Sequence, residues 1–141
     1  MEIRPFAPHD EAAVVALWKE CELTRPWNDP HKDIARKAAV QPELFLVGVL
    51  AEGLIASVMA GYDGHRGWVN YLAVRPSHRG RGFARALMQR VEELLLHRGC
   101  PKVSLLVRSG NRRALDFYRH LGYAQDEAVS LGKRLIRDDA A

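Results

Sequence analysis

The stretch VRPSHRGRGFARAL, residues 74–87, places glycines, arginines and helix-forming residues in an order that could bind an anion. Gly80 and Gly82 lack a Cβ atom, so the backbone around them can curl without steric clash. The apolar rhythm from Phe83 onward predicts a helix, whose first turn leaves backbone N–H groups unpaired. Because these groups carry partial positive charge, we expect the segment RGRGFA to hold a phosphate or pyrophosphate.

The same loop departs from two common nucleotide-binding motifs. No Lys-Ser or Lys-Thr pair follows the glycines, so the loop is not a Walker P-loop. Arg85 stands where the third glycine of the dinucleotide fingerprint G-x-G-x-x-G would lie, so that motif is incomplete. A plain turn with solvent-facing arginines is the alternative interpretation of these residues taken alone.

Around this loop, apolar periodicity and turn residues divide the chain into strands and helices. Strands are expected at residues 2–6, 44–50, 54–62, 68–74, 102–107 and 128–136, the last being AVSLGKRLI. Helices are expected at residues 9–23, within 25–42, between 82 and 99, and at 111–123. Asp29 followed by Pro30 is typical of a helix start, and Gly99 followed by Pro101 is typical of a helix end.

The order of these elements predicts an α/β fold. Residues 44–74 form an expected antiparallel meander, which leads into a strand–loop–helix–strand unit ending at residues 102–107. Such a crossover makes its two strands parallel and right-handed. Ligands of open α/β sheets tend to lie at the carboxyl ends of such strands, and the glycine loop follows one of them.

Two motifs in this order resemble the GNAT superfamily of acyl-CoA N-acyltransferases. Arg79, Gly82 and Ala84 match its R-x-x-G-x-G/A signature, and the preceding YLAVRP resembles its usual approach strand. Downstream, NRRALDFYRHLGY is similar to its second signature, an Asn followed by a helix with Ala, Phe-Tyr and a closing Leu-Gly-aromatic. The stretches RPWNDP, GYDGHRG and SLGKRLI carry a closer likeness to the bacterial YpeA-type acetyltransferases of this superfamily.

The resemblance implies one N-acetyltransferase domain over residues 1–141. It implies a mixed, largely antiparallel sheet with a splayed central parallel strand pair and helices on both faces. It also implies acetyl-CoA as the acyl donor, its pyrophosphate on backbone N–H groups of the loop and its pantetheine arm along an exposed strand edge. The cofactor-binding residues expected on this basis are Leu72, Ala73, Val74, Arg79, Gly80, Arg81, Gly82, Phe83, Ala84, Arg85 and Asn111.

The resemblance assigns roles in the chemistry as well. An amine attacks the thioester carbonyl, and a backbone N–H near Leu72 or Ala73 could stabilise the oxyanion. Tyr118 matches the family tyrosine that protonates the departing thiolate, and a phenol with a pKa of about 10 carries its proton at neutral pH. The alternative is a Tyr118 ring packed in the core beside Phe117. Asn111 is expected both to cap the last helix and to contact the pantetheine arm.

The group that accepts the amine proton is left open by the sequence. Trp68 lies where some family members carry a glutamate. The candidates are therefore Asp63, His65 and Glu43, each with an ordinary turn or surface role as the alternative. The stretch RPWND is expected to line the acceptor side of the cleft, although Trp27 could equally be a core residue.

Composition limits the remaining functions. A chain of 141 residues with 48% apolar content fits one folded domain. Cys21 and Cys100 offer neither a metal-ligand spacing nor a disulfide framework, so no metal is expected. Neither cysteine matches a nucleophile site, which favours direct transfer over an acyl-enzyme. The N-terminus lacks the features of a signal peptide, and no apolar run approaches the roughly 18 residues of a membrane span, so a cytoplasmic protein without a membrane partner is expected.

Two other classes of function compete with the transferase. A coenzyme-A-binding sensor without acceptor turnover is favoured by the absence of the family glutamate. A nucleic-acid-binding domain is permitted by the formal charge of +4, but the arginines are scattered and the aromatic spacing of an RNA module is missing, so no nucleic-acid partner is expected. The acceptor is expected to be an amine on a small molecule or a protein, and a homodimer is compatible with the sequence.

Overall fold

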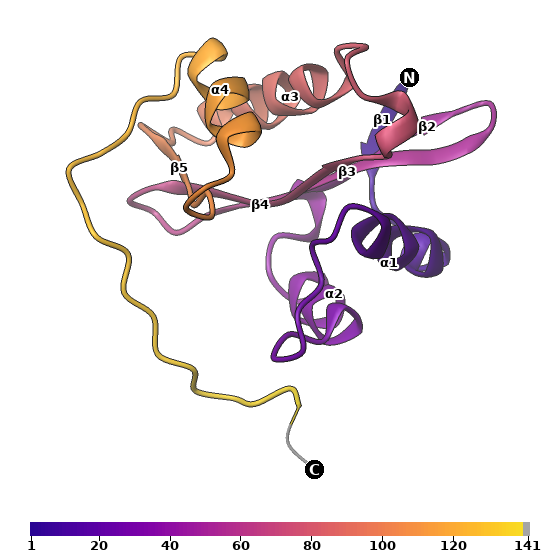
Figure 1. Cartoon of the computed structure of the whole chain (residues 1–141), viewed down its shortest axis with the longest axis horizontal. Helices are drawn as coiled ribbons and strands as arrows, with labels where there is room; N and C mark the ends of the chain where they lie inside the picture. Colours follow the sequence, from indigo (N-terminus) through magenta and orange to yellow (C-terminus); the bar gives the residue numbers. More distant parts are fainter. Residues whose placement is uncertain (140–141) are drawn as a thin grey trace.

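The computed structural model describes residues 1–139 and has a five-stranded sheet at its centre (Figure 1). Its strands lie side by side in the order β1 (Glu2–Pro5), β2 (Phe45–Leu50), β3 (Gly53–Tyr62), β4 (Gly67–Val74) and β5 (Val103–Leu105). Neighbours from β1 to β4 are antiparallel, whereas β4 and β5 are parallel. This arrangement confirms the predicted mixed, largely antiparallel α/β sheet.

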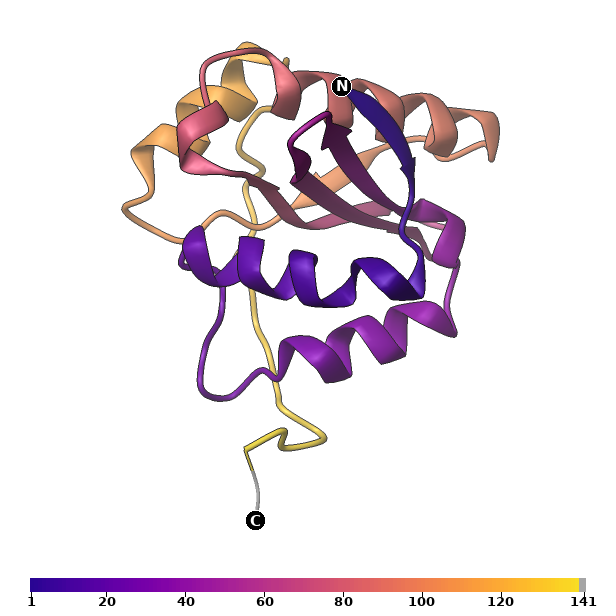
Figure 2. The ribbon, with the colours of Figure 1, turned by 90° about the vertical axis from the view of Figure 1, so that its right-hand side faces the viewer.

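Helices cover both faces of the sheet, as the resemblance implied. One face carries α1 (Glu11–Glu20) and α2 (Pro30–Ala38), and the other carries α3 (Phe83–His97) and α4 (Arg112–His120) (Figures 1 and 2). Single 3₁₀ turns occur at Pro8–Asp10, Pro42–Leu44 and Pro76–His78. Within residues 1–139, no helix has the length and apolar character needed to cross a membrane.

Local sequence signals set the helix starts. The Asp29 carboxylate accepts a hydrogen bond from the His31 N–H at 2.9 Å, and Pro30 is the first helical residue, so α2 begins where predicted. The Asn111 side-chain oxygen accepts a hydrogen bond from the Ala114 N–H at 3.2 Å and caps α4 in the same way. These caps fix the position of two helices that border the site described below.

Each face of the sheet has its own apolar core, and β4 contributes to both. On one face the core contains the apolar side of α3, whose Leu87, Met88, Val91 and Leu95 are almost completely buried. The other core is built around Trp18 of α1 and Phe45 of β2. Val69 and Val74 of β4 belong to the first core and Ala73 belongs to the second. Burial from both sides therefore holds β4 in place.

Strands β4 and β5 separate after three residue pairs. Gly67–Val69 of β4 pairs with Val103–Leu105, and β5 then ends, shorter than the strand predicted over residues 102–107. The second half of β4 has no strand partner on this side among residues 1–139. This confirms the splayed parallel pair and leaves the backbone edge of β4 open from Asn70 onward.

A β-bulge at Tyr71 accompanies the separation. The pairing with β3 shifts between Ser57 and Met59, where β4 accommodates one extra residue. Tyr71 has a φ of +53°, in the left-handed region that aromatic residues rarely adopt. An inserted residue bends a strand and increases its local twist, which directs β4 away from β5.

Three interactions hold Tyr71 in this conformation. The Trp18 ring stacks on the Tyr71 ring with centroids 3.7 Å apart. The Trp18 indole N–H donates to the Ser57 hydroxyl oxygen at 2.9 Å, and the Ser57 hydroxyl donates to the Tyr71 carbonyl at 2.9 Å. Ser57 and Trp18 are both fully buried. A strained backbone persists only where its surroundings determine it in this way.

The C-terminal segment corrects one prediction, because residues 128–136 do not form a strand. The segment runs as an extended chain away from the sheet (Figure 1), and its apolar side chains are exposed, with 91% of Leu131 accessible. The alternating apolar residues of this segment would give a strand one apolar face, but a strand also needs a neighbouring strand to pair with. Polar contacts instead hold the end of the segment on α2, where the Asp138 carboxylate pairs with the Arg36 guanidinium and accepts the Asp29 N–H at 2.8 Å.

Gly67 provides a test of the packing where β4 meets β5. A Cβ atom at Gly67 would lie 2.9 Å from the Cys100 Sγ and 2.9 Å from a Leu95 methyl group. We expect Gly67→Ala to lower the free energy of unfolding by about 1–3 kcal/mol through overpacking, measured by urea denaturation. Gly132→Ala is the matched control, because no atom lies within 4 Å of its added Cβ. Equal stability of the two variants would contradict close packing at Gly67.

Ser57 provides a test of the interactions that support the bulge. Ser57→Ala removes the acceptor of the buried Trp18 indole N–H and the donor to the Tyr71 carbonyl. The free energy of unfolding should fall by about 1–3 kcal/mol, since a buried donor is left without a partner. Ser130→Ala, at an exposed position of the C-terminal segment, serves as the control. A Ser57→Ala variant as stable as the parent in urea would show that the bulge does not need this hydroxyl.

Candidate active site

Two adjoining cavities lie beside the separated end of β4. The first, about 490 Å³, follows the glycine loop and is called the loop cavity. The second, about 900 Å³, is bordered by β4, α2 and the segment after β5, and is called the central cavity. Seven residues line both: Cys21, Leu23, Leu72, Asn111, Arg113, Ala114 and Tyr118. A molecule in one cavity can therefore meet a molecule in the other at this shared border.

The loop cavity has the anion-binding geometry that the glycine loop predicts. Gly80 and Gly82 have φ values of +76° and +83°, and a Cβ added at either residue would meet no atom within 4 Å. Gly82 is the N-cap of α3, and within residues 1–139 no side chain caps this helix. The N–H groups of its first turn are thus available to an anion, and Arg79 and Arg85 line the same cavity.

The structure gathers most of the sequence-predicted site residues around the loop cavity. Eleven of the twelve line it, namely Leu72, Ala73, Val74, Arg79, Gly80, Gly82, Phe83, Ala84, Arg85, Asn111 and Tyr118. The side chain of Arg81 does not, because its guanidinium lies over the Phe83 ring, 5.0 Å from the centroid. The Arg79 Nε donates to the Val74 carbonyl at 3.2 Å and so ties the loop to the end of β4.

Tyr118 lies at the border between the two cavities. Its ring packs edge-on against Phe117, with centroids 5.1 Å apart, and against Tyr123 at 5.7 Å. Burial raises the pKa of Tyr118 to about 12, so the phenol keeps its proton at neutral pH. The phenol oxygen makes no hydrogen bond to any residue from 1 to 139. Among these residues no buried polar side-chain atom lacks a partner, so this oxygen is accessible from the cavities.

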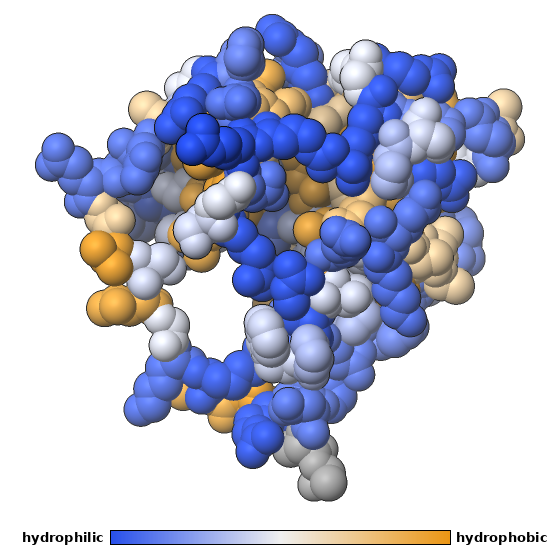
Figure 3. Space-filling view, in the orientation of Figure 1, coloured by the Kyte–Doolittle hydropathy of each residue, from blue (hydrophilic) through white to orange (hydrophobic). Residues whose placement is uncertain are grey.

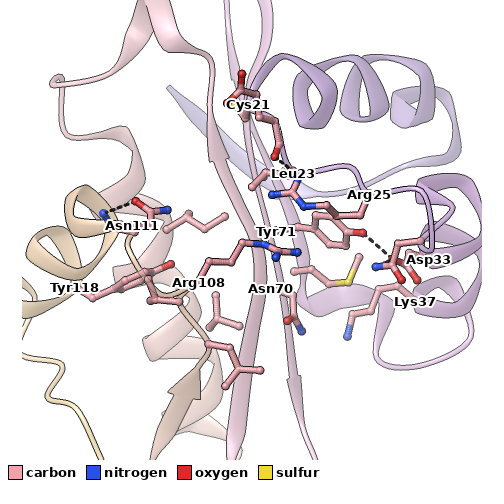
Figure 4. A pocket seen from close by; sticks show the side chains of 18 of the residues that line it. Cys21, Leu23, Arg25, Asp33, Lys37, Asn70, Tyr71, Arg108, Asn111 and Tyr118 are labelled. Carbon is pink, nitrogen blue, oxygen red and sulfur yellow. Dashed lines mark hydrogen bonds between the residues drawn. The ribbon is translucent and has the colours of Figure 1, made fainter. Parts of the chain in front are cut away.

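The other wall of the central cavity is formed by the bulge of β4 and by α2 (Figure 4). The Tyr71 phenol donates to the Asp33 carboxylate at 2.6 Å, and burial together with this carboxylate raises the pKa of Tyr71 well above its usual range. Asp33 also accepts hydrogen bonds from Arg36 at 2.8 Å and from Asn28 at 3.3 Å. The carboxylate is therefore a fixed part of the wall.

Several lining residues were not singled out from the sequence. Tyr71 sits in a stretch that reads as a regular strand, and its positive φ has no sequence signal. Asp33 and Lys37 are four residues apart on α2, a spacing that places two side chains on one helix face and could have indicated them. Arg108 lies in the segment after β5, which ends earlier than predicted, and lines the cavity. From the expected stretch RPWND, Trp27 does line the cavity, with 49% of the residue exposed.

The three candidate bases lie away from both cavities. The Asp63 carboxylate accepts the N–H groups of His65 (2.8 Å) and Arg66 (2.7 Å) and so closes the turn between β3 and β4. Glu43 pairs with Arg98 at 2.6 Å on the surface. The contacts of Asp63 and Glu43 are the turn and surface roles given above as alternatives, and none of the three candidates lines either cavity.

Cys21, which matches no nucleophile motif in the sequence, lines both cavities. Its thiol donates to the Val74 carbonyl at 3.4 Å, and burial raises the pKa of the thiol. The protonated form is a poor nucleophile, so the position of Cys21 does not by itself indicate an acyl-enzyme. In the described part of the chain, no three His, Cys, Asp or Glu side chains are grouped in a way that could hold a metal ion.

Comparison with solved structures finds the same fold in several proteins. Ard1 from Thermoplasma volcanium superposes with a TM-score of 0.76 at 26% identity, over 87% of this chain and 82% of that one. An aminoglycoside 6'-N-acetyltransferase from Acinetobacter haemolyticus gives 0.72 at 20% identity, over 96% and 99%. A NatC complex bound to Gag peptide and CoA gives 0.75 at 22% identity, over 90% and 87%. Because the last two structures are only 20% and 22% identical to this chain, they show a shared fold and nothing more.

Sequence comparison identifies the family. A protein named acetyltransferase from Yersinia enterocolitica is 51% identical over 138 residues, covering 98% of each chain. A protein of the same name from Sodalis glossinidius is 51% identical over 139 residues, with the same coverage. Residues 12–123 match the family described as Acetyltransferase (GNAT) family. The chain therefore belongs to the GNAT acetyltransferases and is an acetyl-CoA-dependent acyltransferase.

Proposed function

We propose that this protein transfers an acetyl group from acetyl-CoA directly to a primary amine, with the coenzyme in the loop cavity and the amine in the central cavity. One observation carries the proposal: the two cavities meet at Leu72 and Tyr118, next to the open end of β4. Such a meeting point brings the two reactants together, and correct placement of reactants accounts for much of the catalysis of a bimolecular reaction.

The residues of the loop cavity fit coenzyme A. The free N–H groups at the start of α3 suit the pyrophosphate, and Arg79 and Arg85 add positive charge. Apolar side chains, among them Leu72 and Phe117, suit the pantetheine arm. The open backbone edge of β4 can pair with the amide groups of that arm as a further strand would. Acetyl-CoA supplies the acyl group as a thioester.

The residues at the border suit the transfer step. A backbone N–H of β4 near Leu72 or Ala73 would hydrogen-bond the acetyl oxygen as negative charge develops on it. The amine nitrogen bonds to the acetyl carbon as the carbon–sulfur bond breaks. The Tyr118 phenol would give its proton to the departing sulfur, and the proton that the amine loses restores the phenol, directly or through water. The half-buried Cys21 thiol, with its raised pKa, is not needed in this scheme.

The reaction itself is tested by thiol release from acetyl-CoA with a panel of primary amines. The panel should contain free amino acids, polyamines, an aminoglycoside and short peptides with free N-termini. We expect release that depends on both the amine and the protein, with the acetylated amine detected by mass spectrometry. Tight binding of acetyl-CoA without turnover of any amine would instead indicate a coenzyme-A-binding sensor.

Gly82 tests the site of the pyrophosphate. Gly82→Asp places a carboxylate and a Cβ at a residue with φ of +83°, where the backbone must approach the phosphates. We expect calorimetry to show loss of acetyl-CoA binding while the variant still folds.

Gly99→Asp is the matched control, since Gly99 has φ of +82° and follows the opposite end of α3. This change introduces the same strain and charge away from the loop cavity. Equal acetyl-CoA affinity in the two variants would argue against phosphate binding at the glycine loop.

Tyr118 tests the proton donor. Tyr118→Phe keeps the packed ring and removes the phenol, so kcat should fall by about 10²–10⁴-fold where chemistry limits turnover. The KM for acetyl-CoA and the melting temperature should stay near those of the parent. Because burial raises the pKa of Tyr118 to about 12, the activity of the parent should show no loss from this group between pH 7 and about 10.

Tyr123→Phe is the control for the aromatic cluster. Tyr123 packs edge-on against Tyr118, and its phenol donates to Glu92 at 2.6 Å, outside both cavities. Its loss should reduce stability and leave kcat unchanged. A Tyr118→Phe variant that is merely less stable, with normal kcat, would assign Tyr118 to the core.

A further inference from the structure

The charged residues of the central cavity indicate the kind of amine it accepts, and this inference rests on the function proposed above. Cationic side chains outnumber acidic ones on its walls. The cations are Arg25, Arg36, Lys37, Arg108 and Arg113, and the acids are Glu22 and Asp33. A cavity meant for an amine without other charge has no need of this excess, since an ammonium would be repelled by it.

The acidic groups offset only part of this charge, because both Asp33 and Asp138 pair with the same cation, Arg36. Asp33 is engaged by the Tyr71 phenol, by Arg36 and by Asn28 within the wall. Glu22 is an exposed residue with a φ of +59°. Asp33 and Glu22 together therefore do not neutralise all the guanidinium groups that line the cavity.

Two of the arginines are placed to hold a ligand. The Arg25 Nη1 donates to the carbonyls of Glu22 and Thr24, both at 2.8 Å, which fixes the guanidinium and leaves its other nitrogens for an anion. Arg108 makes no side-chain hydrogen bond or ion pair with any residue between 1 and 139. Figure 4 shows the two side chains reaching into the cavity from different walls, Arg25 from the segment after α1 and Arg108 from the segment after β5.

These two arginines are separate from the expected phosphate contacts. Arg25 and Arg108 line the central cavity but not the loop cavity, whereas Arg113 lines both. The phosphates of the coenzyme are expected at the glycine loop, at the far end of the loop cavity. An anion between Arg25 and Arg108 must therefore belong to the acceptor.

The chain itself shows that this side of the molecule binds carboxylates. The Asp138 carboxylate of the C-terminal segment is held by Arg36, a residue of the cavity wall, and by the Asp29 N–H. Only 1% of the Asp138 side chain is exposed, so this is a well-enclosed contact. The Arg25 and Arg108 guanidinium groups have no such carboxylate within the described residues.

We infer that the acceptor is a primary amine that also carries a carboxylate, which Arg108 and Arg25 hold while the amine reaches the border at Tyr118. A guanidinium matches a carboxylate through two parallel hydrogen bonds, so it fixes orientation as well as charge. A free amino acid and an acidic residue at a peptide N-terminus both offer this chemistry. Polyamines, which carry only positive charge, are disfavoured.

The inference is tested with acceptors that differ only in the carboxylate. One arm compares free amino acids with their carboxamides, and a second compares peptides that start with Glu or Gln and end in an amide. The acidic member of a pair should have at least about a tenfold higher kcat/KM, as expected from loss of a charge-assisted hydrogen bond. A preference for the acid in the first arm identifies a free amino acid as the acceptor. A preference for the acid in the second arm identifies a peptide with an acidic N-terminal residue.

Arg108→Ala then links the preference to the cavity. We expect the KM for the acidic acceptor to rise about 10- to 100-fold, with no change for its neutral partner or for acetyl-CoA. Arg108→Lys should raise the KM for the acidic acceptor less than Arg108→Ala does. Arg90→Ala, on the outer surface of α3, is the control and should behave like the parent protein. As a readout besides activity, calorimetry should show that the N-acetylated acidic product binds the parent more tightly than it binds Arg108→Ala.

The outcomes separate this inference from the proposed function. Turnover that is equal or faster with neutral amines, or an Arg108→Ala defect shared by both members of each pair, would overturn the carboxylate inference and leave the transferase standing. Absence of thiol release with every amine tested would overturn the proposed function, and the inference with it.

Discussion

The separation of β4 from β5 after Val69 is the constraint on which both cavities depend. Two parallel strands would ordinarily pair along their shared length and bury their backbone groups in that pairing. Here an extra residue at Tyr71 turns β4 away, and β5 ends at Leu105. The strain at Tyr71 is offset by buried contacts with Trp18 and Ser57, so the core of one sheet face maintains the opening on the other side.

The two cavities hold charge by different means. In the loop cavity the backbone N–H groups at the start of α3, which need glycines more than any particular side chain, add to the positive charge of Arg79 and Arg85. In the central cavity the positive charge comes from guanidinium groups on loops and helices. A backbone site suits a ligand shared by a whole family, whereas a site built from side chains can change with few substitutions. The acceptor is thus the part of the reaction that a family likeness informs least.

Helix α2 connects the wall of the central cavity with the C-terminal segment that contains Asp138. One side of it presents Asp33 and Lys37 to the central cavity, and Arg36 takes the Asp138 carboxylate of the C-terminal segment. Relatives 51% identical over 98% of the chain cover this region together with the glycine loop. Residues 128–136 do not form the strand that their apolar alternation predicted, and polar contacts with Arg36 and the Asp29 N–H hold the end of the segment instead.

The sequence by itself determined the local features. Short-range signals in the sequence predict the caps at Asp29 and Asn111, the glycine loop before α3 and the crossover into β5. The two motifs identified the family and named most of the residues that line the loop cavity. Only the tertiary structure decided the bulge at Tyr71, the walls of the central cavity and the absence of a final strand. These depend on pairing and packing between residues far apart in the chain, such as Ser57 with Tyr71 or Arg36 with Asp138, and periodicity in one segment carries no information about which partner it meets.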